Sequence, residues 1–156
     1  MNKETGSREG AKTRRDVEEL AAIVVDCSLN LHWGLGPRLL ESVYEAVLAN
    51  MLQRGVSVEQ QKSVPICFQG VTLDEGFRLD LLVDGQLIVE LKLVETIHPL
   101  HPKQLLTYLR PMELPLGLLI NFGAPLLKDG LKQIVNNHTN FSSSHLRMHH
   151  QEVDHG

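Results

Sequence analysis

The chain has 156 residues, 42% of them hydrophobic and 22% charged, with a formal net charge of −4 and a pI near 6.0. This length suits one domain with a real core and is too short for two domains to be expected. No apolar run approaches the roughly 20 residues of a membrane span, and the acidic balance excludes a protein that coats nucleic acid by bulk charge. Any contact with phosphate is therefore expected to be local.

The N-terminal segment is polar and lacks an apolar stretch, so it predicts no secretory signal. Two cysteines are too few for a disulfide framework, and cytoplasm is the expected compartment. Cys27 lies on the apolar stripe of a predicted helix and Cys67 lies in a predicted strand, so both are expected to be small buried hydrophobic side chains. Residues 1–14 show no apolar periodicity and are expected to be a disordered lead.

Two amphipathic helices are predicted before any strand. After Asp16, apolar residues recur at three- and four-residue steps, at Val17, Leu20, Ala21, Val24, Cys27 and Leu31. Gly34 and Gly36 are expected to end this helix. Pro37 suits the first turn of a second helix, which should stop at Gly55. Its apolar positions are Leu40, Val43, Tyr44, Val47, Leu48 and Met51.

The middle of the chain changes to short β-branched or aliphatic runs separated by turn residues, which predicts an antiparallel meander. The runs cover residues 56–58, 64–68, 71–73, 77–83 and 87–94. Pro65 favours an edge position. Beyond Pro99 and Pro102, the periodicity predicts a short helix, then an apolar strand over residues 116–122, and a last helix over residues 125–136.

The domain is expected to span residues 15–137, because residues 138–156 lose all periodicity and predict a disordered tail. Five of the eight histidines lie in this tail. A structural zinc site needs ligands held by a fold or by cysteine partners, and a polar, serine-rich tail has neither. A metal site is therefore not expected there.

Residues 76–93 place apolar and polar side chains at alternating positions of two predicted strands. The apolar set is odd-numbered, at Leu79, Leu81, Val83, Leu87, Val89, Leu91 and Leu93, and the polar set is even-numbered, at Arg78, Asp80, Glu90 and Lys92. Side chains alternate between the two faces of a strand, and opposite residues of an antiparallel pair share a face. The length of the turn therefore decides which sets come together.

A two-residue turn at Asp84 and Gly85 would set the polar residues of one strand against the apolar residues of the other. A three-residue loop over residues 83–85, with Gly85 in the left-handed conformation, instead puts the two apolar sets on one face. The same loop gathers Asp80, Glu90 and Lys92 on the other face.

Two carboxylates and an ammonium on one half-buried face are unfavourable unless they serve one another or a ligand. Oxygen ligands from Asp80 and Glu90 suit Mg²⁺ or Mn²⁺, which would polarise a phosphate oxygen and acidify a bound water. Lys92 could orient or deprotonate that water. The alternative is a structural ion pair of Lys92 with one of the two carboxylates.

The order of Asp80, Glu90 and Lys92 in successive strands resembles the PD-(D/E)XK phosphodiesterase superfamily, with Leu79 in place of the proline. The run GPRLLESVY at residues 36–44 and LINFG at residues 119–123 resemble the small bacterial family of GxxExxY proteins, over residues 34–136. The resemblance implies a restriction-endonuclease-like core of the α/β (α+β-like) class, with a central mixed sheet flanked by helices. It also implies a Mg²⁺- or Mn²⁺-dependent nuclease that acts on nucleic acid, DNA in preference to RNA.

Further residues have candidate roles. Glu41 and Tyr44 share a helix face; Glu41 could reach the metal directly or through water, or be a first-turn carboxylate favoured by the helix dipole. Tyr44 is expected in the core with its hydroxyl bonded to one partner. The resemblance implies that Gln104 and Tyr108 position a DNA strand or the lysine, with helix-surface packing as the alternative. His101 could be a second base or a side chain that stabilises a loop.

Two other functional classes stay open. A non-catalytic nucleic-acid- or protein-binding module that retains the fold is favoured by the acidic pI and by only seven aromatic residues. A structural or toxin–antitoxin-type partner protein would use the polar trio as an ion-pair network. A homodimer is one way in which a small acidic nuclease could build a basic groove.

Overall fold

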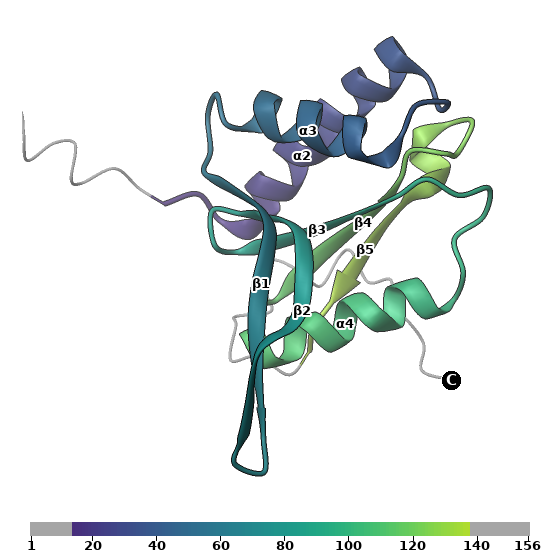
Figure 1. The fold of residues 1–156 in the computed structure, drawn as a ribbon. Helices are drawn as coiled ribbons and strands as arrows, with labels where there is room; N and C mark the ends of the chain where they lie inside the picture. The colour runs from purple at the N-terminus through teal and green to yellow at the C-terminus, as the bar shows by residue number, and fades with distance from the viewer. Residues whose placement is uncertain (1–13, 138–156) are drawn as a thin grey trace, which may run out of the picture.

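The computed structural model describes residues 14–137. The predicted tail with its five histidines, and all but the last residue of the predicted lead, lie outside the described residues. In chain order, the described elements are α2 (Val17–Leu35), α3 (Glu41–Leu52), β1 (Val58–Phe68), β2 (Val71–Val83), β3 (Leu87–Lys92), α4 (Leu100–Met112), β4 (Leu116–Asn121), the 3₁₀ helix η1 (Leu127–Gly130) and β5 (Leu131–Val135), shown in Figure 1.

The five strands of this described part form one mixed sheet, in the order β1-β2-β3-β4-β5. β3 and β4 are parallel, and the other neighbouring strands are antiparallel. α4 lies in the crossover that joins the two parallel strands, as parallel pairing requires. Figure 1 shows α2 and α3 on one face of the sheet and α4 on the other. This is the expected α/β arrangement of a central mixed sheet flanked by helices.

Helix α2 begins with a capping box. The side chain of Asp16 accepts a hydrogen bond of 2.8 Å from the Glu19 N–H, and the Glu19 side chain accepts one of 3.3 Å from the Asp16 N–H. The helix ends at Gly36, whose φ of 74° is in the left-handed range. Gly34 lies inside the helix, so the prediction that it ends the helix is wrong: a glycine lowers helix propensity without breaking the hydrogen-bond ladder.

Helix α3 begins at Glu41 and not at Pro37, because the turn before it is bound by a side chain. Tyr44 is fully buried, and its hydroxyl donates to the Gly36 carbonyl and accepts from the Leu39 N–H at 3.2 Å. The tyrosine ring stacks on Phe122, with ring centroids 4.7 Å apart. Tyr44 therefore has the core position expected of it and also ties α3 to the preceding turn.

Two predictions about the β1–β2 hairpin need correction. The short strands predicted over residues 56–83 are two long strands, with a bulge between Val64 and Ile66. Residues 64–77, which we call the arm, extend beyond the rest of the sheet as a two-stranded ribbon in Figure 1. Cys67 lies on the arm and is exposed, so the prediction that it is buried is wrong. A strand pattern does not show whether another layer of the protein covers the strand. Cys27 is half-buried against the main core.

The predicted last helix is wrong. Residues 125–136 form η1 and then β5, which pairs antiparallel with β4. Short apolar runs are compatible with either structure, and the tertiary contacts decide between them. At Gly130 a Cβ atom would lie 2.6 Å from the Asn121 carbonyl oxygen, so the backbone must turn there in close contact with the end of β4. No helix within residues 14–137 is both long and apolar enough to cross a membrane.

Candidate active site

The β2–β3 hairpin has the predicted alternation. Leu81 pairs with Val89 and Val83 with Leu87, around a three-residue loop over residues 84–86. Gly85 has a φ of 65°, as predicted. The loop lies one residue later than the predicted 83–85, and moving the whole loop by one residue keeps odd positions opposite odd positions. The apolar sets therefore still meet, and Asp80 comes to face Glu90.

β2 and β3 stop pairing beyond Leu81 and Val89, and we call this point the fork. Side chains continue the hydrogen bonding there: the Asp80 N–H donates to Glu90 Oε1 at 3.2 Å, and the Leu91 N–H donates to Asp80 Oδ2 at 2.8 Å. These bonds satisfy backbone donors that a regular ladder would have paired. Asp80 and Glu90, the carboxylate pair, are thereby held side by side.

Leu79 does not join the odd-numbered apolar set, contrary to prediction. It packs with the cluster under α4, whereas Leu81 and Val83 pack with the cluster under α2 and α3. Figure 1 shows β1 and β2 turning away from β3 beyond the fork. The change of direction brings Leu79 to the other side of the sheet.

Glu90 is the most buried charged group of the site, with 8% of its surface exposed. The pKa of Glu90 is raised to about 8, first by burial and then by the nearby charge of Asp80, while the hydrogen bond from the Asp80 backbone and the charge of Lys92 act in the opposite direction. The pair therefore resists carrying two negative charges. A divalent cation between the carboxylates would remove this repulsion.

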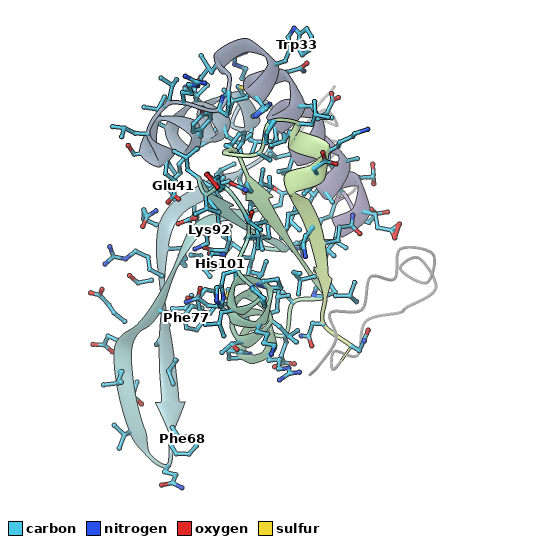
Figure 2. All side chains as sticks on the ribbon, turned by 90° about the vertical axis from the view of Figure 1, so that its right-hand side faces the viewer. Trp33, Glu41, Phe68, Phe77, Lys92 and His101 are labelled. Atoms are coloured by element: carbon cyan, nitrogen blue, oxygen red, sulfur yellow. The ribbon has the colours of Figure 1, made fainter. Side chains whose placement is uncertain are left out.

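Lys92 and Glu41 lie close to the carboxylate pair. Burial raises the pKa of Glu41, the charge of Asp80 adds to the rise, and Lys92 counteracts it. Figure 2 shows Glu41, Lys92 and His101 one below another beside the end of β3. Within residues 14–137 the ion pairs are Lys62–Glu59 and Arg78–Glu75, so Lys92 forms none with the carboxylate pair. The alternative of a structural ion pair is therefore not observed.

Helix α4 turns one face toward the site. Tyr108 stacks on Phe77 of the arm with ring centroids 4.4 Å apart and planes 2° from parallel. Burial raises the pKa of Tyr108, and the charges of Glu90 and Asp80 raise it further. The Tyr108 hydroxyl therefore lies within the electrostatic field of the carboxylate pair. His101 has a buried Nδ1 atom without a partner, and its pKa is lowered by burial and then by Lys92. Gln104 is exposed, one turn before Tyr108.

Gln61 is a contact of the site that the sequence did not indicate. Its backbone has a φ of 50°, which is uncommon outside glycine and often marks a functional position. Its amide donates to Glu45 at 2.8 Å and to Asp80 Oδ1 at 3.4 Å, so it links α3 to the carboxylate pair. The neighbouring Gln60 also donates to Glu45, at 3.2 Å. Gln61 differs from Gln60 in its left-handed backbone and in its hydrogen bond to Asp80, and no sequence signal predicts either feature.

The donor set fits a hard divalent cation bound mainly by water and phosphate. Within the described residues, no three histidine, cysteine, aspartate or glutamate side chains lie close enough together to hold a metal ion. Mg²⁺, however, commonly takes one or two carboxylates and completes its shell with water and substrate phosphate. In Asp80 and Glu90, one oxygen of each side chain accepts a backbone N–H, and the second oxygen of Asp80 accepts from the Gln61 amide at 3.4 Å. A carboxylate offers about four lone-pair sites, so both side chains keep acceptor capacity for a ligand.

The comparison with protein families agrees with this geometry. The family described as the PD-(D/E)XK nuclease superfamily matches residues 18–134, which is most of the chain. The chain belongs to the PD-(D/E)XK nuclease superfamily. Its mixed sheet and flanking helices are consistent with the restriction-endonuclease-like core predicted from the sequence. No curated protein and no solved structure matches the chain.

Proposed function

We propose that the protein is a metal-dependent phosphodiesterase that hydrolyses nucleic acid by water attack at phosphorus. The observation that carries the proposal is the carboxylate pair in the fork, with Lys92 two residues beyond Glu90 and without an ion-pair partner in that pair. Two neighbouring carboxylates, one of them the buried Glu90 with its raised pKa, are unfavourable for stability when neither forms an ion pair. Membership of a nuclease superfamily supports the same chemistry.

Each residue has a defined part in this proposal. Asp80 and Glu90 would hold Mg²⁺ or Mn²⁺, and Glu41, which forms no three-residue metal cluster with them in the described part of the chain, would contribute through water. The bound ion supplies Lewis acidity toward a phosphate oxygen and lowers the pKa of a water molecule. Lys92 orients the attacking water and stabilises the negative charge that develops on the phosphate oxygens as the new O–P bond forms and the old P–O bond breaks. Tyr108, stacked on Phe77, supports Lys92 and the substrate from the α4 side.

The finer parts of the proposal follow from the motifs of the sequence. The chain is a GxxExxY protein that works in the cytoplasm, with DNA as the preferred substrate over RNA and with Gln104 and His101 in contact with the strand. A homodimer would provide a second source of positive charge for an acidic protein. Sedimentation with and without a DNA duplex tests this last point separately.

Calorimetric titration with Mn²⁺ in the presence of a short duplex tests the proposal. Wild type should bind saturably, and Asp80→Asn should not, because the amide keeps the shape of the side chain and removes its charge. Asp74→Asn on the exposed arm is the matched control: it has the same charge change away from the fork and should bind like wild type. An absence of saturable binding in wild type at millimolar Mn²⁺ would overturn the proposal.

A non-catalytic binding module is the second candidate, favoured by a different observation. The arm exposes the apolar side chains of Ile66, Phe68, Val71 and Leu73, between 37% and 69% of their surface. Partner-binding surfaces often carry such exposed apolar groups. This candidate predicts that Asp80→Asn leaves partner binding intact, whereas replacement of Phe68 by serine weakens it.

A further inference from the structure

A pocket lies at the N-terminal end of α4, on the side of the helix that carries His101. Its volume is about 510 Å³, within the roughly 300–1,000 Å³ range of small-molecule sites and larger than a lone ion needs. Six residues line it, and none of them is acidic: His98, Leu100, His101, Lys103, Gln104 and Thr107. In a chain with a net charge of −4, a pocket lined by one lysine, two histidines and two neutral polar residues is suited to an anion.

The donors of this α4 pocket are side chains. His98 Nδ1 accepts a 3.0 Å hydrogen bond from the Leu100 N–H, so the proton of the neutral ring is on Nε2, which is then a donor. Lys103 adds an exposed ammonium group, and Gln104 adds an amide. The first-turn amides are already used, since the His101 N–H donates to the His98 carbonyl at 2.9 Å and Pro102 has no N–H. The end of the helix is therefore not the source of the anion-binding character.

His101 relates the α4 pocket to Lys92. His101 lines the pocket, and its pKa is lowered first by burial and then by the charge of Lys92, so the histidine lies within the electrostatic field of Lys92. Figure 2 shows Lys92 directly above His101. His101 and His98 are also neighbours, with ring centroids 6.2 Å apart. A nucleic-acid strand whose scissile phosphate lies at Lys92 would therefore bring a neighbouring phosphate to the α4 pocket.

We propose that the α4 pocket binds a second phosphate group of the nucleic-acid strand, with Lys103 and His98 as its principal contacts. Lysine binds phosphate as a point charge, and the Nε2–H of His98 adds a directed donor. The phosphate is either an internal diester or a terminal monoester, which carries about −1.5 to −2 charges at neutral pH. The position of this phosphate relative to the cleaved bond rests on the proposed function, whereas the binding of phosphate does not.

Binding of three oligonucleotides without divalent metal tests this proposal. They share one single-stranded sequence and carry a 5′-phosphate, a 3′-phosphate or hydroxyl ends only, and fluorescence anisotropy in EDTA reports their affinity. Lys103→Gln should weaken binding about 3- to 10-fold and lower the salt dependence by about one phosphate contact. His98→Gln should have a smaller effect in the same direction, because it removes an uncharged donor.

Arg54→Gln is the matched control. This variant also removes one exposed positive charge. Arg54, however, follows the C-terminal end of α3, a 12-residue helix whose first residue is Glu41. The length of such a helix, about 18 Å, separates it from the site, so its binding curve should match that of wild type. Superimposable thermal melts of the three variants exclude unfolding as the cause of a loss.

The pattern across the oligonucleotides distinguishes the sources of the phosphate. A loss confined to the 5′- or the 3′-phosphorylated strand assigns the α4 pocket to a terminal phosphate, and an equal loss on all three assigns it to an internal diester. Wild-type affinity of Lys103→Gln for all three, or no binding by wild type, overturns the proposal. The Mn²⁺ titration of Asp80→Asn is a separate measurement, so a failure of the metal site is distinguishable from a failure of the α4 pocket.

Discussion

The two halves of the β2–β3 hairpin differ although they belong to the same two strands. In the closed half, next to the loop, backbone hydrogen bonds pair the strands, and Leu81, Val83, Leu87 and Val89 are fully buried. In the open half, beyond the fork, the carboxylates of Asp80 and Glu90 replace the missing backbone partners. The closed half is built for stability. The open half holds two neighbouring carboxylates, and burial makes the ionisation of Glu90 unfavourable, as the proposed metal site would require.

The largest expected effect is on turnover and concerns Lys92. Lys92→Ala should lower the rate of nucleic-acid hydrolysis by about 10²- to 10⁴-fold, because it removes the group that orients water and stabilises the developing charge. Mn²⁺ binding should be kept, since the carboxylate pair is unchanged. Rates on a panel of DNA and RNA strands, together with calorimetry, measure both quantities.

Lys62→Ala is the control for the loss of a lysine from a strand. Lys62 lies on β1 in an exposed ion pair with Glu59, and its removal should leave hydrolysis unchanged. Equal rates for wild type and Lys92→Ala would contradict the role of Lys92 and favour the non-catalytic module.

The next effect is on stability and belongs to the closed half. Leu87→Ala should lower the free energy of unfolding by about 2–5 kcal/mol, because it leaves a cavity in the core between the sheet and helices α2 and α3. Leu73→Ala on the exposed arm should change it by less than about 0.5 kcal/mol. Urea denaturation compares the two variants, and similar losses in both would mean that the arm is covered in solution.

A pH-dependent effect should appear in the open half. The folded pKa of Glu90 is about 8 against an ordinary value of 4.5, so the folded state holds this proton more tightly than the unfolded state does. The contribution of Glu90 to the free energy of unfolding is therefore fully stabilising below about pH 4.5 and is lost as the pH rises through 8. Without metal, Glu90→Gln should be more stable than wild type at pH 9 and close to it at pH 4.5.

Unfolding of both proteins at the two pH values checks this sign. Groups away from the fork titrate equally in wild type and variant, so the difference between them reports on Glu90 and the groups coupled to it. Mn²⁺ affinity of wild type should rise with pH up to about 8, because the ion displaces the proton. If Glu90→Gln and wild type had the same difference in free energy of unfolding at both pH values, the ionisation of Glu90 would not destabilise the folded state.

The smallest effect concerns the link between α3 and the fork. Gln61→Ala should reduce hydrolysis by roughly 2- to 10-fold, which corresponds to the loss of one or two hydrogen bonds. Gln60→Ala is matched to it, since the Gln60 side chain also donates to Glu45, whereas the hydrogen bond to Asp80 comes from Gln61. If both variants lose activity equally, the contact with Glu45 accounts for the effect and Asp80 does not.

The sequence alone predicted features that depend on neighbours along the chain. The alternation over residues 76–93 and the left-handed glycine at position 85 were enough to bring Asp80 and Glu90 together. Helix periodicity gave α2, α3 and α4, with errors at the ends where a side chain such as Tyr44 binds the turn. The motif of Asp80, Glu90 and Lys92 led to the correct superfamily. These inferences need only side-chain spacing and turn chemistry.

The tertiary structure alone decided the features that depend on distant contacts. Residues 131–135 are a strand because β4 has an open edge to pair with, although their apolar spacing also suits a helix. The exposed arm, the fork, the link through Gln61 and the α4 pocket all depend on where β2 leaves β3 and on how α4 packs. Spacing along the chain determines which side chains share a face, but the partners that cover or leave open that face come from other parts of the chain.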